Sequence, residues 1–178
     1  MITKVTIDDA PALQRLFERC SEFWELVEGV PPPADSAVKE LTFLAPGKTA
    51  DDTFTFGVFE DDRLIAFAHV TRDCPKPSEW WIALLLLDPS QRGRGLGAEI
   101  HREIAEWVAA QGGASLGIAV QTQNERAEKF WLRQGYVDRG RQAYVAGSGL
   151  KGEIIVMSLN LGSRLSAVGS PESPVRSC

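Results

Sequence analysis

Residues 84–98 decide the fold of this chain, and they read LLLLDPSQRGRGLGA. The four leucines close an apolar run that begins at Trp80 and has the length of a buried strand. A turn rich in glycine follows the strand, and a helix is expected to begin near Gly95. The segment therefore predicts a strand, a tight turn and a helix in direct succession, which is an arrangement of α/β folds.

The turn itself predicts an anion-binding site. Gly93, Gly95 and Gly97 allow several backbone N–H groups to point to one side, because no Cβ atom stands in the way. The beginning of a helix adds unpaired N–H donors and a partial positive charge. Arg92 and Arg94 can add charge-assisted contacts. Together these groups suit a pyrophosphate, although a tight, solvated connection is the alternative for the turn taken alone.

Two other phosphate-binding motifs are disfavoured. Gly93, Gly95 and Ala98 formally satisfy the dinucleotide fingerprint Gly-x-Gly-x-x-Ala. That fingerprint requires an acidic residue at the end of the following strand, where residues 120–123 read VQTQ. The Gly-x4-Gly-Lys-Ser/Thr pattern of the P-loop is absent from the sequence.

Hydrophobic periodicity extends the prediction over the whole chain. The expected strands lie near Val5 and over residues 53–58, 64–70, 80–87, 116–120, 141–146 and 153–161, and the expected helices lie over residues 8–28, 34–44, 95–111 and 124–134. The order predicts an α/β (α+β) fold with a mixed central sheet of about six to seven strands and helices on both faces. Residues 1–161 are expected to form one domain, and residues 162–178 a disordered tail.

Composition narrows the classes of partner. A length of 178 residues suits one compact domain, and a net charge of −5 gives no reason to expect nucleic-acid or membrane binding. The N-terminal segment has no apolar core of a signal peptide, so a cytoplasmic protein is expected. Three cysteines at unrelated spacings and two histidines predict no disulfide framework and no metal site.

Two segments resemble the GNAT superfamily of acyl-CoA-dependent N-acyltransferases. Residues 92–97 read RGRGLG and fit the Arg/Gln-x-x-Gly-x-Gly/Ala element of that family. Residues 124–136 read NERAEKFWLRQGY and are similar to the family's second segment, Asn-x-x-Ala-x-x-Phe-Tyr-x-x-x-Gly-Phe. The resemblance covers roughly residues 53–161 and implies the GNAT fold.

The resemblance implies acetyl-CoA as the co-substrate and assigns its contacts residue by residue. The turn amides would hold the pyrophosphate, and the backbone of two leucines would pair with the pantetheine arm. An amide near Leu85 would polarise the thioester carbonyl. The implied contacts are Leu85, Leu87, Arg92, Gly93, Arg94, Gly95, Gly97, Ala98, Asn124 and Phe130.

One departure from the family pattern concerns the general acid. The family often places a tyrosine after the phenylalanine of the second segment, but this chain has Trp131, whose indole N–H cannot deliver a proton in this way. Tyr144 is the predicted replacement. Water can also protonate the thiolate, or the chain binds CoA without catalysis. Tyr136 matches a packing aromatic.

The attacking amine also needs a base, and Glu79 is the first candidate. A solvated loop carboxylate is the alternative for Glu79. His69 shares its strand parity with apolar neighbours, so it is either a core histidine or a base. His101 is expected on the surface of the long helix.

The sequence as a whole predicts an N-acetyltransferase that moves an acetyl group from acetyl-CoA to a primary amine by direct attack in a ternary complex. The acceptor is a small molecule or a peptide, no metal is expected, and a homodimer is possible. Residues 20–35 combine three glutamates with aromatic side chains, which favours a cationic acceptor, or else forms only a solvated acidic face. The alternatives are a regulatory CoA-binding module and a Rossmann oxidoreductase.

Overall fold

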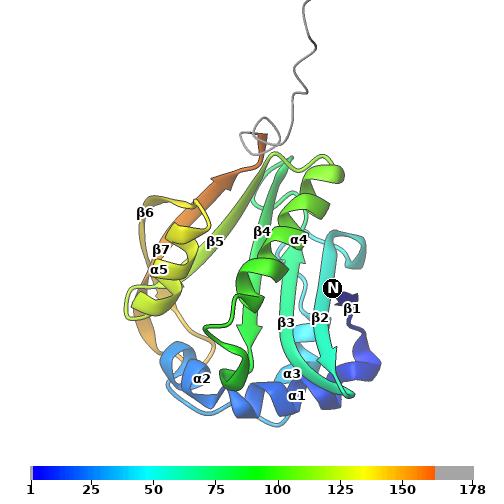
Figure 1. Cartoon of the computed structure of the whole chain (residues 1–178). Coiled ribbons are helices and arrows are strands. Elements are labelled where there is room, and N and C mark those ends of the chain that lie inside the picture. The colour runs from blue at the N-terminus through cyan, green and yellow to red at the C-terminus, as the bar shows by residue number, and fades with distance from the viewer. Residues whose placement is uncertain (1, 163–178) are drawn as a thin grey trace, which may run out of the picture.

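The computed structural model describes residues 2–162, and in these residues seven strands form one sheet with the order β1-β2-β3-β4-β5-β7-β6 (Figure 1). The strands are β1 (Thr3–Lys4), β2 (Thr53–Glu60), β3 (Arg63–Thr71), β4 (Glu79–Leu87), β5 (Ser115–Gln121), β6 (Val137–Val145) and β7 (Lys151–Asn160). Strands β4 and β5 pair in parallel, and the other neighbours pair antiparallel. The predicted mixed sheet is confirmed.

Helices cover both faces of the sheet, as predicted. They are α1 (Ala10–Arg19), α2 (Ser21–Glu28), α3 (Ser36–Thr42), α4 (Leu96–Ala110) and α5 (Glu125–Arg133), with short 3₁₀ turns η1 (Ile7–Asp9), η2 (Ala50–Asp52) and η3 (Pro89–Gln91). Helices α4 and α5 lie in front of the sheet in Figure 1, and α1 to α3 lie along its lower end and behind it. Because the side chains of β3 alternate between the faces, Ala68 and Val70 join the core under α4, whereas Phe67 joins the core under α1. Leu64 also joins the core under α1, because a bulge between Leu64 and Ala66 shifts the alternation.

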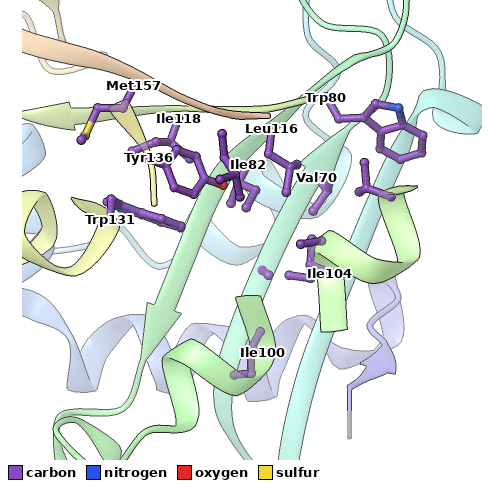
Figure 2. Packing of buried hydrophobic residues seen from close by; sticks show 14 of the residues in the cluster. Val70, Trp80, Ile82, Ile100, Ile104, Leu116, Ile118, Trp131, Tyr136 and Met157 are labelled. Atoms are coloured by element: carbon purple, nitrogen blue, oxygen red, sulfur yellow. The ribbon is translucent and has the colours of Figure 1, made fainter. Parts of the chain in front are cut away.

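The larger core lies between α4, α5 and the sheet. Figure 2 shows Ile100 and Ile104 of α4 directed at the strands, and Trp131 beside Tyr136 near β5 and β7. His101 belongs to this core, because its imidazole is fully buried and packs against Trp131 and Tyr136. The prediction of a surface position for His101 is therefore wrong. The sequence shows only that this residue neighbours Ile100 on the helix, not which flank of the helix the sheet covers.

The N-terminal helix predicted over residues 8–28 is in fact two helices. Cys20 leaves the helical conformation with φ −105° and ψ 31°, and α2 begins at the next residue. Apolar spacing continues through the break, so the pattern could not reveal it. The predicted stop at Gly29 is confirmed, because this glycine ends α2 in the left-handed region with φ 74°.

Among residues 2–162, no helix is long and apolar enough to cross a membrane. The tail predicted over residues 162–178 lies outside the described residues, except for Gly162.

Strands β4 and β5 pair over only three residues each and then separate. The pairs join Glu79–Trp81 with Ser115–Gly117, and none is formed beyond Trp81 in the described chain. On its other side, β4 contains a bulge, because His69 pairs with Leu84 while Val70 pairs with Ile82. Figure 1 shows the two strands diverging toward the end of β4. The sheet is thus open beside residues 83–87, and this opening positions the site.

Candidate functional site

The open edge of β4 presents backbone groups of two leucines. Asp88 N–H donates to the carbonyl of Ile65 at 2.8 Å, and Ala66 pairs with Leu87 in the same register. Backbone groups of an antiparallel strand alternate between the two sides. The N–H and C=O groups of Leu85 and Leu87 therefore point away from β3, toward the opening between β4 and β5.

The turn after β4 forms a cradle of free amides. Gly93 and Gly95 adopt φ 77° and 92°, a region that favours glycine, and α4 begins directly after Gly95. Among the described residues, the backbone N–H groups of residues 93–97 have no hydrogen-bond acceptor. Arg92 N–H donates to Pro89 O at 3.4 Å and Ala98 N–H to Gly95 O at 2.9 Å. We call residues 93–97 the cradle, since the two flanking amides are already engaged.

The two arginines of the turn differ in position. The Arg92 guanidinium turns inward, where Nε donates to Leu87 O at 3.0 Å and the side chain pairs with Glu22 of α2. It also lies 3.5 Å from the thiol of Cys20. Arg94 is exposed. The Arg92 side chain therefore connects β4 to the junction of α1 and α2. Of the two arginines of the turn, the exposed Arg94 is the one that can approach an anion.

Asp88 anchors the start of the turn. Its carboxylate is buried and accepts hydrogen bonds from Arg19 and Arg63 at 2.6 Å each, and from the N–H and hydroxyl of Ser90. Burial by itself would raise the pKa of Asp88, but the hydrogen bonds from Ser90, Arg63 and Arg19 outweigh it and hold that pKa well below its usual range. The carboxylate therefore stays ionised and holds the end of β4 against α1 and β3.

Helix α5 closes the cradle from the other side. Asn124 caps this helix, accepting a hydrogen bond from Ala127 N–H at 3.1 Å. The ring of Phe130 lies against Gly97, 3.4 Å from the position that a Cβ atom would occupy there. Of the two predicted residues, Phe130 thus lies next to the cradle and joins α5 to the first turn of α4, whereas the Asn124 side chain caps α5.

Tyr144 lies across the opening from Leu85. Its hydroxyl donates to Val27 O of α2 at 2.9 Å and accepts a hydrogen bond from Nε2 of Gln121. Continuing the parallel register beyond Trp81 and Gly117, with the one extra residue that the bulge adds to β4, places Gln121 about level with Leu85 and Leu86. Burial raises the pKa of Tyr144, the charge of Glu28 raises it further, and the hydrogen bond from Gln121 opposes them. The sequence does not single out Gln121, whose hydrogen-bond partner Tyr144 lies on β6 and is itself bonded to α2.

A family model described as the acetyltransferase (GNAT) family matches residues 11–136. The chain belongs to this family. Acetyl-CoA transfer is typical of GNAT proteins, and the opening with its cradle fits such a co-substrate, because it offers free amides at one end and strand-like backbone groups along one wall. No curated protein matches the chain.

Three solved structures illustrate the shared GNAT fold. An acetyltransferase from Thermus thermophilus is 22% identical with a TM-score of 0.69, over 90% of this chain and 96% of that chain. The ribosomal-protein-S18-alanine N-acetyltransferase from Escherichia coli is 17% identical with a TM-score of 0.67, over 90% and 93%. A probable acetyltransferase from Staphylococcus epidermidis is 17% identical with a TM-score of 0.71, over 90% and 98%. At these identities the likeness concerns the fold.

The position of the usual GNAT tyrosine is occupied by a core residue. Trp131 is 7% exposed and packs against Phe130, Tyr136 and His101. The indole therefore fills space between α4 and α5, and Tyr144 reaches the opening from the opposite side of the sheet.

The structure does not bring Glu79 together with the cradle. Glu79 precedes Leu85 by six residues on β4, a separation of roughly 20 Å along a strand. Its carboxylate pairs with Lys76 at 3.1 Å and lines an open pocket of about 570 Å³ with Trp81 and Arg139 at the other end of the sheet. His69 lies closer to Leu85 than Glu79 does, since it pairs with Leu84 across β3 and β4.

His69 has the surroundings of an oriented imidazole. Its ring is fully buried beneath α3, and Nδ1 lies 2.7 Å from a carboxylate oxygen of Glu40. Nε2 has no hydrogen-bond partner among the described residues. Residues 2–162 contain no group of three His, Cys, Asp or Glu side chains placed to hold a metal ion.

Proposed function

We propose that this GNAT protein transfers an acetyl group from acetyl-CoA to a primary amine of a small-molecule or peptide acceptor. The single observation that carries the proposal is the opening between β4 and β5, which ends at the amides of residues 93–97. The amine attacks the thioester directly in a ternary complex. As the C–N bond forms, the C–S bond breaks, the amine loses a proton and the thiolate gains one.

The chain's own groups divide the binding of acetyl-CoA between them. The cradle amides and the N-terminus of α4 take the pyrophosphate, with Arg94 beside them. The Leu85 carbonyl and the Leu87 N–H pair with the pantetheine amides, as an added strand would, because the Leu87 carbonyl already accepts a hydrogen bond from Arg92. The Leu85 amide donates to the thioester carbonyl, where negative charge develops during attack. Phe130 and Asn124 line the path from α5.

Tyr144 is the proposed general acid. It stands at the level of the proposed thioester, and its raised pKa keeps the phenol protonated at neutral pH. To protonate the departing thiolate, the hydroxyl must release its hydrogen bond to Val27 O. Trp131 has no such proton and lies in the core.

For the base, the geometry favours His69 over Glu79. Glu40 orients the imidazole of His69 through Nδ1, and Nε2 has no partner among residues 2–162. His69 pairs across the strands with Leu84, the residue before Leu85. Because the ring is buried, proton transfer from the amine to Nε2 passes through a water molecule. A regulatory CoA-binding module is the second candidate function, and the absence of the usual tyrosine at Trp131 is the observation that favours it.

Binding of acetyl-CoA is tested with Gly95→Glu and a matched control, Gly112→Glu. Both glycines have a positive φ and open space around the Cβ position, but Gly112 follows the far end of α4. Acetyl-CoA at about 100 times its Kd should raise the wild-type Tm by about 5 to 10 °C. The control should respond equally, whereas the anion at position 95 should abolish the shift. A folded Gly95→Glu protein that still responds contradicts the cradle.

Turnover then separates the enzyme from the regulatory module. CoA release is followed with acetyl-CoA and a panel of amines: spermidine, a lysine-containing peptide and a peptide that begins with alanine. The last is included because the E. coli structure is named for an alanine acceptor. Turnover of any amine supports the transferase, and tight acetyl-CoA binding without turnover of any amine supports the module.

A further inference from the structure

Gln121 leaves one buried polar atom without a partner beside the opening. The residue is 8% exposed and ends β5. Its Nε2 donates to the Tyr144 hydroxyl, but Oε1 is buried and receives no hydrogen bond from any described residue. A buried carbonyl oxygen without a donor destabilises a fold, so such an atom calls for a ligand or a bound water.

The orientation of the Gln121 side chain follows from its neighbours. Tyr144 donates its only hydroxyl proton to Val27 O at 2.9 Å, so toward Gln121 the hydroxyl oxygen can only accept. The glutamine must therefore present its NH₂ group to Tyr144. If the carboxamide were flipped, its oxygen would face the oxygen of the Tyr144 hydroxyl. That contact would be favourable only if Tyr144 turned its proton away from Val27 O. The free oxygen is thus fixed on the side away from Tyr144.

The position of Gln121 places this oxygen on the acceptor side of the opening. Val120 packs in the core under α4, so the next residue along β5 projects from the opposite face, where α2 contributes Val27. The register, with the bulge of β4 included, places Gln121 about level with Leu85 and Leu86 across the separated strands. Gln121 therefore lies on the same face as α2, which belongs to the segment 20–35 that the sequence favours for the acceptor.

We propose that Oε1 of Gln121 accepts an N–H of the acceptor amine and so positions its nitrogen for attack on the thioester carbon held at the Leu85 amide. This inference rests on the proposed function. A neutral carboxamide oxygen binds any amine that carries an N–H, and it rejects a quaternary ammonium, which offers none. Gln121 is therefore a specificity-determining residue that selects primary and secondary amines, and Tyr144 holds it in orientation.

The direct test uses the side-chain ¹⁵NH₂ signals of glutamine in the CoA-saturated protein, with n-butylamine as the probe. The Gln121 signal is assigned by its loss in Gln121→Leu, or in Gln121→Met if the leucine variant does not fold. We expect this signal to shift saturably with n-butylamine and to remain in place with tetramethylammonium, which carries the same charge at neutral pH without an N–H. No shift with n-butylamine, or equal shifts with both cations, overturns the inference.

Kinetics gives a second readout. With the amine of the panel that turns over fastest, Gln121→Leu should raise the KM for the amine at least tenfold and change the KM for acetyl-CoA less than twofold. Equal effects on both constants contradict a role in acceptor binding. Failure of the wild type to bind acetyl-CoA instead rejects the proposed function, so the two failures are distinguishable.

Discussion

At the scale of single residues, the proton on Tyr144 is the feature most open to test. Replacement by phenylalanine keeps the ring over Gly152 and removes the proposed acid. We expect kcat to fall by about 100-fold, the usual size of a general acid–base contribution, with little change in the KM for acetyl-CoA. Since burial and Glu28 raise the pKa of Tyr144, the alkaline fall in wild-type kcat should begin above about pH 10.

The pH profile distinguishes catalysis from packing. In Tyr144→Phe this alkaline limb should disappear. In Glu28→Gln it should move to lower pH, because the negative charge that raises the pKa is removed. A limb that persists in Tyr144→Phe assigns the titration to another group and contradicts the proposed acid.

The positions of site residues were predictable from the sequence only where local pattern determines them. The glycines of the turn were found because positive φ and a helix start leave a local signature. Gln121 carries no such signal, since its partner Tyr144 is distant in sequence, as is Val27, to which Tyr144 donates. The sequence indicates Glu79 because it stands beside the apolar strand. However, Glu79 begins β4 and the cradle follows its other end, so the length of the strand separates the two.

At the scale of elements, Asp88 connects β4 to its neighbours. Removing one member of a buried, charged cluster leaves the others unpaired, so Asp88→Asn should lower the free energy of unfolding at pH 7 by about 3–5 kcal/mol. Arg19 and Arg63 lose their shared partner in this variant. Asp52→Asn is the control, because its partnership with Arg72 is more exposed, and we expect a much smaller change.

The same comparison has a defined pH dependence. A depressed pKa in the folded state stabilises the protein above the unfolded-state value of about 3.9, and this stabilisation is lost as pH falls toward the folded-state pKa. Urea unfolding should therefore show the largest difference between the wild type and Asp88→Asn above about pH 4, and convergence below it. A difference that stays constant down to pH 2 contradicts the linkage.

The elements themselves were largely predictable, and their junctions were not. Periodicity located the strands and helices, but the break at Cys20 preserves apolar spacing on both sides. Tertiary contacts stabilise the break between α1 and α2. Arg92 pairs with Glu22 and approaches the Cys20 thiol, and Cys20 contacts Leu87 O at 3.3 Å. Burial raises the pKa of this thiol to about 11, although Arg92 opposes the rise, so the thiol stays protonated.

At the scale of the whole molecule, the order of strands could not be predicted from the sequence beyond its class. The alternation of strands and helices predicts a mixed sheet, and neighbouring hairpins follow from short turns. However, β7 pairs between β5 and β6, which places the last strand inside the sheet and β6 at its edge. Either strand of a final hairpin could have paired with β5, and side-chain packing over the whole sheet decides between them.

Residues 79–81 of β4 pair with residues 115–117 of β5, and we call this short paired region the seam, because it joins the two halves of the sheet. The close approach of the two strands there depends on Gly117. A Cβ atom at Gly117 would lie 2.4 Å from the ring of Trp81, so the indole must shift or the strands must separate. Gly117→Ala should therefore cost about 1–3 kcal/mol of stability through overpacking. Gly147→Ala is the control, since its new Cβ would lie 3.5 Å from the nearest atom, at ordinary contact distance.

A double-mutant cycle assigns the effect to the ring. Trp81→Leu removes the clash, so the combined variant should lose less stability than the sum of the two single changes. Because the seam determines where the strands part, Gly117→Ala should also weaken acetyl-CoA binding, measured by calorimetry, while Gly147→Ala leaves it unchanged. If Gly117→Ala is tolerated as well as the control, the pairing of β4 with β5 does not depend on the close approach of Gly117 to Trp81.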